Sequence, residues 1–293
     1  MHMMNPSVCS LKGRRRFLLI GIPLILIFLM AAFDPRLSVR TYTIGSPKIS
    51  KPVRIALVTD LHSCRYGEEQ KNLIRALDRE KPDVILLGGD IFDDVLDDEN
   101  TEHFIRGISG RYPCFYVTGN HEYWSGADAF REKMELLKKY GISVLSGDSK
   151  TLAVRGETIR VCGIDDPDFY KVHKDISPEE AKTRFLGQLD AVASETEDGV
   201  FSILLSHRPE YFEYYQTYDF DLVLCGHAHG GQWRIPWLIN GLFAPDQGLF
   251  PEYAGGKYEE NGTSMIVSRG LARESTRIPR IFNRPELVIV DIE

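Results

Sequence analysis

The sequence predicts an α/β protein in which apolar strands alternate with amphipathic helices. Five short apolar runs each lead, within three positions, to a polar residue that can bind a metal. Continuous apolar runs of this length are typical of strands in a sheet covered on both faces. Thirty positions separate Asp60 from Asp90, and thirty again separate Asp90 from Asn120, which fits successive strand-helix-strand units. The five runs occupy 53–58, 84–87, 115–117, 201–205 and 222–225.

The other predicted elements follow from periodicity and turn residues. Phe130, Met134 and Leu137 recur at helical spacing, and Pro178 stands in the first turn of a predicted helix, where proline is favoured. The tripeptide 155–157 separates two strand-like runs and predicts a hairpin. In chain order these elements are a strand at 39–44, helices at 69–79 and 127–140, hairpin strands at 151–154 and 158–163, a helix at 178–192, and strands at 263–268 and 287–292.

Four segments make up the predicted organisation of the chain. Residues 1–16 are basic, 17–33 are apolar and uncharged, 34–50 are mainly polar with several prolines, and 51–293 hold the α/β domain. The apolar run of 17 residues has the minimum length that spans a bilayer. It predicts a transmembrane helix or signal anchor, and the segment that follows predicts a tether.

Cations flank the apolar run on its N-terminal side. They predict a cell-membrane protein whose N-terminus is cytoplasmic and whose α/β domain is extracytoplasmic. The cluster also resembles a twin-arginine export signal. Because 30–33 contains no Ala-x-Ala cleavage site, a retained anchor is preferred and a removed signal peptide is the alternative. The cations are Lys12, Arg14, Arg15 and Arg16.

The charge balance bears on the class of partner. The chain carries a formal net charge of -7 at pH 7 and has a pI near 5.7. Non-specific nucleic-acid binding needs a basic surface, so no nucleic-acid partner is expected. An anionic substrate would be attracted by bound cations rather than by the field of the whole protein.

Five short blocks along the domain contain the residue types that bind divalent metals. Carboxylate, amide and imidazole side chains suit hard to borderline cations. Each block follows one of the five apolar runs, and the carboxyl ends of strands in open α/β sheets line the ligand crevice. The blocks therefore predict one site built from distant parts of the chain. They are Asp60-Leu61-His62, Gly88-Gly89-Asp90, Gly119-Asn120-His121, His207 and Gly226-His227-Ala228-His229.

In this order, the blocks resemble those of the calcineurin-like metallophosphoesterase superfamily. The resemblance extends over 51–293, and the stretches 226–232, 267–271 and 283–286 are similar to a membrane-associated bacterial branch. That branch includes phosphodiesterases and UDP-2,3-diacylglucosamine hydrolase-like proteins. The fold that the resemblance implies is a four-layer α/β/β/α sandwich, with two mixed sheets back to back and helices outside.

The resemblance also implies a role for each residue of the blocks. His121 would be catalytic, because it would protonate the leaving oxygen or stabilise charge on the phosphoryl group. The cofactors would be two divalent ions, and Mn, Fe and Zn are all compatible with these ligands. One metal would be held by Asp60, His62 and His229, the other by Asn120, His207 and His227, with Asp90 bridging the two.

The expected activity is hydrolysis of a phosphodiester or phosphoanhydride by a metal-activated hydroxide. A lipid-linked substrate is one option, and a phosphomonoester is another. The alternative to an enzyme is a metal-binding interaction module at the cell envelope that has lost catalysis. None of the seven predicted ligands is replaced, and neither is His121, which favours the enzyme.

Two other stretches bear on partners. The run 233–250 is rich in tryptophan and aliphatic residues, broken by glycine and proline. It would either contact lipid at a membrane interface, where tryptophan is favoured, or fold over the sheet edge as ordinary core cover. The acidic run 93–99 is interpreted as a solvated helix start or loop rather than a third cation site.

Overall fold

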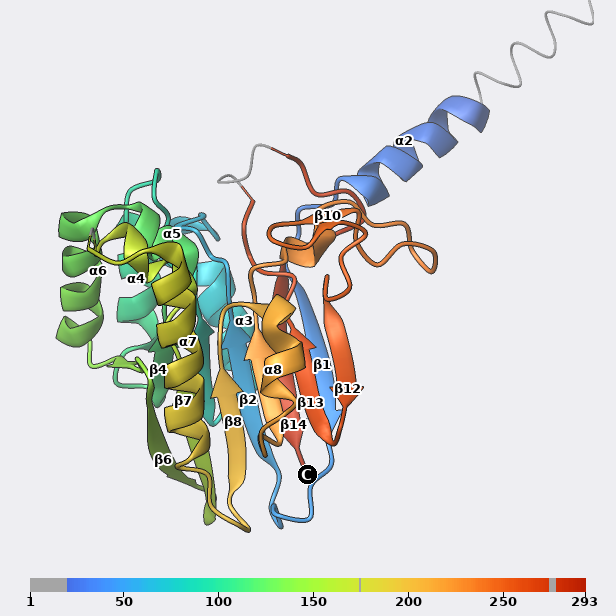
Figure 1. Ribbon diagram of the computed structural model, residues 1–293. Coiled ribbons are helices and arrows are strands. Elements are labelled where there is room, and N and C mark those ends of the chain that lie inside the picture. The colour runs from blue at the N-terminus through green and yellow to red at the C-terminus, as the bar shows by residue number, and fades with distance from the viewer. Residues whose placement is uncertain (1–19, 174, 274–277) are drawn as a thin grey trace, which may run out of the picture.

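The computed structural model describes residues 20–173, 175–273 and 278–293, and these form two stacked sheets with helices on both outer faces (Figure 1). Three hydrophobic clusters correspond to the three interfaces between four layers. One cluster lies between the sheets, and the other two lie between each sheet and its helices. The α/β class and the two-sheet arrangement expected from the sequence are therefore confirmed.

The first sheet has six strands and contains three of the apolar runs. Its strands β2 to β5 are parallel, β14 is antiparallel to β2, and β1 pairs with β14 in parallel at the edge. Residues that the sequence assigns to the tether thus include an edge strand of the domain. The order is β1 (Ser38–Ile44), β14 (Glu286–Ile292), β2 (Val53–Val58), β3 (Val84–Gly88), β4 (Cys114–Val117) and β5 (Ser143–Val144).

The second sheet also has six strands, and it contains the predicted hairpin. Its outer pairs are antiparallel and its inner pairs are parallel. The order is β12 (Gly256–Glu260), β13 (Thr263–Val267), β9 (Leu222–Cys225), β8 (Phe201–Leu205), β7 (Glu157–Gly163) and β6 (Asp148–Val154). A separate two-stranded pair joins β10 (Phe243–Ala244) to β11 (Gly248–Leu249).

Helices cover the outer face of each sheet through apolar side chains at helical spacing. Leu73 and Leu77 of α3 and Leu137 of α6 lie in the cluster against the first sheet, and Phe185 and Leu189 of α7 lie in the cluster against the second. These helices are α3 (Lys71–Glu80), α4 (Glu99–Ile108) and α6 (Ala127–Lys139) on the first sheet, with α7 (Pro178–Ala193) and α8 (Phe212–Tyr215) on the second.

Predicted helices and strands agree with the observed ones to within a few residues. The helix predicted to begin with Pro178 starts there, and the Ser177 hydroxyl caps it by accepting a hydrogen bond from the Glu180 N–H at 3.2 Å. Several short elements have no sequence prediction, among them β5, β12, α8 and α5 (Asn120–Trp124). Each is too short to show a period of its own.

The N-terminal apolar run is described only from residue 20 onward. Its helix α2 (Ile22–Ala32) has 11 residues and extends away from the sandwich (Figure 1). Among the residues described, none of the helices combines the length and apolar character that a bilayer crossing requires. The predicted transmembrane helix at 17–33 is therefore not supported. Residues 17–19 and the basic segment 1–16, with Lys12, lie outside the described residues.

Candidate metal centre

The five predicted blocks converge at one end of the sandwich. Asp60, Asp90 and Asn120 follow β2, β3 and β4 of the first sheet, whereas His207 and His227 follow β8 and β9 of the second. This is the end at which α5 is labelled in Figure 1, since Asn120 is the first residue of that helix. The parallel strands of both sheets place their carboxyl ends here, which brings residues far apart in sequence into one site.

Four groups of possible ligand atoms lie within this site, and two of them consist of predicted ligands alone. The other two join Asp93 and His121 to His62, and Glu210 and Asp246 to His227. Asp60, His62 and His229 offer ligand atoms that are within 4.8 Å of one another, and so do Asp90, His207 and His227. These are the same two sets that the resemblance implies for the two metals, with Asn120 as the remaining member of the second.

Asp90 lies between the two groups. Its Oδ2 is 3.1 Å from Nε2 of His207, in one group, and 3.5 Å from Nε2 of His62, in the other. A carboxylate in this position can contact two cations at once and offset their mutual repulsion. The geometry is therefore consistent with the bridging role predicted for Asp90.

The donor atoms of the site are buried and lack partners. A buried polar atom without a hydrogen bond costs about 1–3 kcal/mol, so a cluster of them indicates a missing ligand. Each atom can donate a lone pair to a cation, and together they fit the mixed oxygen and nitrogen coordination of Mn, Fe or Zn. Within the described part of the chain, the atoms without a partner include Asp60 Oδ2, His62 Nε2, Asp90 Oδ2, Asn120 Oδ1, His207 Nε2 and His229 Nδ1.

Three of the imidazoles are held through their other ring nitrogen. The Nδ1 atoms of His62 and His207 lie 2.9 Å from Asp93 Oδ1 and 2.8 Å from the Gly88 carbonyl oxygen, respectively. Nε2 of His227 lies 3.0 Å from Asp246 Oδ2. A carboxylate or carbonyl on the outer nitrogen fixes the ring orientation and makes the inner nitrogen more basic, as is usual for histidines that bind metals.

The backbone at the site is strained. Asp60, His62, Asp90, His227 and His229 all have left-handed φ angles, between 47° and 65°. Such angles are uncommon for residues with a Cβ, and they concentrate at functional sites because the surrounding structure can hold them there. These five of the seven predicted ligands are therefore placed by tertiary constraints rather than by local preference.

Close packing around His207 explains why position 89 is a glycine. Gly89 has a φ of 87°, and a Cβ at this position would lie 2.6 Å from His207 Nδ1. No other residue can adopt this backbone without moving the imidazole away from Asp90. Gly89 therefore allows the strand-end turn and the imidazole to share the same space.

The charges of the site favour the metal-binding forms of Asp90 and His227 but not that of His207. Burial raises the pKa of Asp90, but attraction to His207 and His121 outweighs burial and holds that pKa well below its usual range. Burial and the neighbouring Arg208 lower the pKa of His227 to about 4. Burial likewise lowers the pKa of His207, yet Asp90 outweighs burial and raises it to about 10. A cation must therefore displace a proton from His207 in order to bind.

His121 lies at the rim of the site and is partly exposed. Its backbone N–H donates to Asp90 Oδ1 at 2.9 Å, and its ring contacts that of His62 with centroids 4.3 Å apart. Nδ1 lies 2.6 Å from Asp94 Oδ1, so Nε2 is the ring nitrogen left for a substrate. The structure thus places the predicted catalytic residue beside the candidate metal ligands.

The interpretation of the acidic run 93–99 as solvated is wrong for Asp93, whereas Asp94 lies in a loop and is partly exposed. Asp93 is buried against His62, and Asp94 orients His121. Both follow Asp90 by only three or four positions, which is the signal that could have indicated their proximity to the site. The rest of the run leads into α4 as expected.

Two buried charged side chains near the site had no prediction. Glu122 accepts hydrogen bonds from the backbone N–H groups of Asp90 and Gly119, at 3.0 and 2.7 Å, and so ties the ends of β3 and β4 together. Arg208 donates to Asp166 Oδ2 at 2.5 Å and lies 3.0 Å from Nε2 of His227. The Glu122 and Arg208 side chains therefore position candidate metal ligands and are not ligands themselves.

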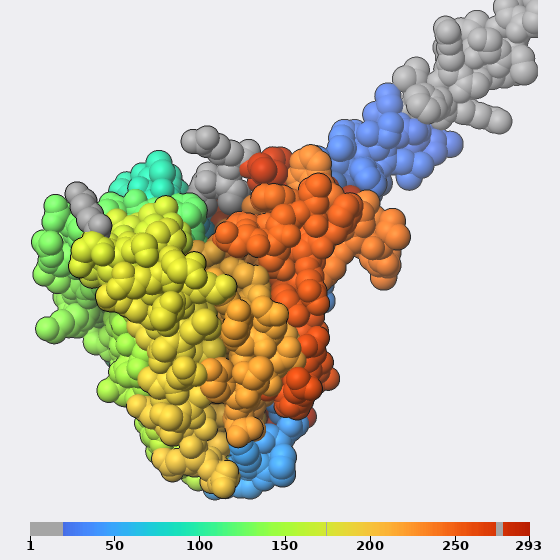
Figure 2. Space-filling view, in the orientation of Figure 1, coloured from blue at the N-terminus to red at the C-terminus, as the bar shows by residue number. Residues whose placement is uncertain are grey.

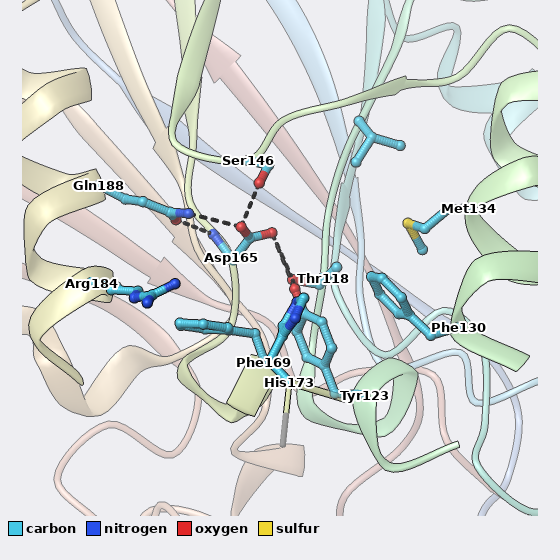
Figure 3. A pocket seen from close by; sticks show the side chains of 11 residues that line it. Thr118, Tyr123, Phe130, Met134, Ser146, Asp165, Phe169, His173, Arg184 and Gln188 are labelled. Carbon is cyan, nitrogen blue, oxygen red and sulfur yellow. Dashed lines mark hydrogen bonds between the residues drawn. The ribbon is translucent and has the colours of Figure 1, made fainter. Parts of the chain in front are cut away.

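A pocket of about 390 Å³ opens beside the site, between α6 and α7 (Figure 3). Phe130 and Met134 line it from one side and Gln188 from the other, and the Asp165 carboxylate lies at its centre. Asp165 accepts hydrogen bonds from Thr118, Ser146, Tyr123 and Gln188. These bonds saturate the carboxylate, so it serves to join the two halves of the sandwich.

Two stacked mixed sheets with a strand-end cluster of carboxylate, amide and imidazole ligands define a metal-dependent phosphoesterase. The chain belongs to the calcineurin-like phosphoesterase family, whose model matches residues 53–231. The groups of candidate ligands at its strand ends are in keeping with a metal-dependent member of this family. The resemblance found in the sequence is thereby confirmed at the level of the family.

Several relatives match most of this chain. An uncharacterized metallophosphoesterase of Aquifex aeolicus is 28% identical over 266 residues, covering 88% of this chain and 92% of the relative. The phosphodiesterase YaeI of Escherichia coli is 27% identical over 245 residues, covering 82% of each. An uncharacterized metallophosphoesterase of Campylobacter jejuni is 27% identical over 270 residues, covering 87% of this chain but only 63% of the relative.

Proposed function

We propose that the chain hydrolyses a phosphodiester or phosphoanhydride with the help of two divalent cations bridged by Asp90. The observation that carries this proposal is the pair of buried ligand groups, with Asp90 of one group facing His62 of the other, that present unpartnered donor atoms. When bound, two such cations lower the pKa of a water towards neutrality and offset the charge of the phosphoryl group. Mn, Fe and Zn all suit these ligands.

The residues of the chain then have distinct tasks. Asp60, His62, Asn120, His207, His227 and His229 would hold the cations, and Asp90 would contact both. His121 would donate a proton to the leaving oxygen through Nε2, because Asp94 engages its Nδ1. Its position at the rim keeps that nitrogen accessible to a substrate.

The proposal favours a diester over a monoester for one reason outside the site. The Escherichia coli relative is named a phosphodiesterase, and it covers 82% of this chain. A lipid-linked diester or anhydride is the form we propose, because exposed apolar side chains lie on the segment 233–250 that follows His229. A phosphomonoesterase and a non-catalytic metal-binding module are the competing outcomes.

An activity screen of metal-reconstituted protein tests the reaction. After reconstitution with Mn²⁺, Fe²⁺ or Zn²⁺ we expect about two ions per chain and hydrolysis of bis-aryl phosphodiesters or UDP-linked lipids in preference to aryl monoesters. Chelation should abolish the activity, and readdition of the metal should restore it. Preference for monoesters would indicate a phosphomonoesterase. Inactivity on all three classes at full metal content would favour the interaction module.

The proposal extends to the placement of the protein. We propose that the N-terminal segment holds it at the cell membrane, with the metal centre outside the cytoplasm. Two features support this placement: the basic flank of the apolar run and the exposure of the large apolar side chains of α2, which is between 43% and 74%. Such exposure in water is unfavourable at about 25 cal/mol per Å² of apolar surface, so a covering medium is expected.

Fractionation of cells that express the full-length chain tests placement. The protein should sediment with membranes and resist carbonate extraction. Protease added to intact spheroplasts should digest the domain. Release by carbonate would contradict the anchor. Protection of the domain until the cells are lysed would place the metal centre in the cytoplasm.

A further inference from the structure

The segment 233–250 exposes apolar side chains that a covering loop would bury. Trp237 is fully exposed, and Leu238, Leu249 and Phe250 are 65–78% exposed. If the segment only covered the sheet edge, these side chains would point towards the core. The exposed side chains thus disagree with the interpretation of the segment as core cover.

This segment lies beside the base of α2. The Trp233 indole N–H donates to the Pro279 carbonyl at 3.0 Å, and the Phe282 N–H donates to the Ala32 carbonyl at the end of α2 at 2.7 Å. In Figure 2 the orange segment accordingly protrudes from the sandwich next to that helix. The two sets of exposed apolar side chains therefore face the same surroundings.

A pocket of about 360 Å³ in the same region is lined by three arginines, Arg40, Arg234 and Arg269. Arg269 pairs with Glu286. Within the described residues, neither Arg40 nor Arg234 has a carboxylate oxygen within 4.0 Å. Burial and the charge of Arg269 lower the pKa of Arg234, as expected where positive charge is in excess. The pocket thus carries uncompensated positive charge on a chain whose net charge is -7.

We propose that segment 233–250 and this arginine pocket form an interfacial surface that binds an anionic phospholipid bilayer. Tryptophan and aliphatic side chains at its tip would enter the headgroup region, where amphipathic rings are favoured. Arg40 and Arg234 would face lipid phosphates, which offsets the repulsion between an acidic protein and an anionic membrane. The inference does not rest on the proposed reaction.

The surface is also directly joined to the metal centre. The Asn283 side-chain amide donates to the carbonyl of His229 at 2.7 Å and to that of Gln232 at 3.1 Å. Asn283 therefore ties the candidate ligand His229 to the residue that precedes the exposed segment. A bilayer bound at this surface lies beside the metal centre.

Tryptophan fluorescence of the full-length protein in vesicles tests the surface. The chain has three tryptophans, Trp124, Trp233 and Trp237, and α2 contains none. With brominated-acyl phosphatidylcholine and phosphatidylglycerol, we expect quenching and a blue shift of the emission. Trp237→Phe should remove much of the quenching, whereas Trp124→Phe, on the other side of the site, should retain it. Full access of iodide to Trp237 in the vesicles would overturn the proposal.

Charge variants test the lipid preference. Arg40→Gln should require roughly fivefold more phosphatidylglycerol for half-maximal quenching, since each basic side chain near an anionic surface contributes about that factor. Arg131→Gln, at an exposed arginine of α6, is the matched control and should behave as wild type. Equal quenching in neutral and anionic vesicles would contradict the role of the arginines. Shielding of Trp237 that appears without lipid and grows with protein concentration would identify a second copy as the occupant.

Discussion

Replacing His121 with alanine should lower kcat by roughly 10² to 10⁴ while leaving about two ions per chain. The reason is that the imidazole acts on the substrate and is not one of the seven predicted metal ligands. Its side chain is partly exposed at the rim, so its truncation leaves no buried cavity. Metal analysis and steady-state kinetics of the same preparation measure both quantities. A His121→Ala protein as active as wild type would contradict the catalytic role.

Two further variants distinguish the orientation of the His121 ring from its action on the substrate. Asp94→Asn keeps an oxygen beside His121 Nδ1 but loses the carboxylate charge, so kcat should fall by a smaller factor, roughly 10 to 100. His103→Ala changes a histidine of α4 that is not among the site residues, and it should leave kcat unchanged. A loss of activity in His103→Ala would show that the assay reports stability rather than catalysis.

Replacing Asp90 should prevent the binding of two ions and abolish activity. Its carboxylate is buried between His62 and His207 and is the group that faces both ligand sets. Without it, two cations would repel each other with no negative charge between them. In Asp90→Ala we therefore expect at most one ion per chain and activity at the level of the metal-free protein. Metal content and hydrolysis of the best substrate from the screen measure the effect.

The variant Asp90→Asn tests whether misfolding, rather than loss of the carboxylate charge, causes the loss of metal and activity in Asp90→Ala. The amide oxygen can still accept the hydrogen bond from the His121 N–H, so the local fold is kept while the charge is lost. Asp97→Asn, at an exposed position in the same acidic run, is the matched control and should bind two ions. An Asp90→Asn protein that retains two ions and full activity would show that Asp90 does not bridge them.

The residues that hydrogen-bond to the site histidines could not be predicted from the sequence. Nothing local shows that Asp93 contacts His62 while its neighbour Asp94 contacts His121. Successive residues point in different directions, and which partner each meets depends on how the 93–99 run leaves β3 and enters α4. The same holds for Asp246, which reaches His227 only because the 233–250 segment turns back over the site.

The order and chemical types of the candidate ligands were determined by the sequence itself. Apolar runs that end in Asp60, Asp90 and Asn120 indicate strand ends locally, because burial on both faces requires continuous apolar residues. The family could be recognised from these blocks. The distances between the ligands could not be predicted from them, because Asp60 and His229 follow strands of different sheets. Asp60 Oδ1 and His229 Nε2 approach to 3.8 Å only when the sheets stack. Burial of apolar side chains across the whole interface between the sheets drives that stacking. The tertiary structure alone therefore decided the geometry of the candidate metal centre and the exposure of Trp237.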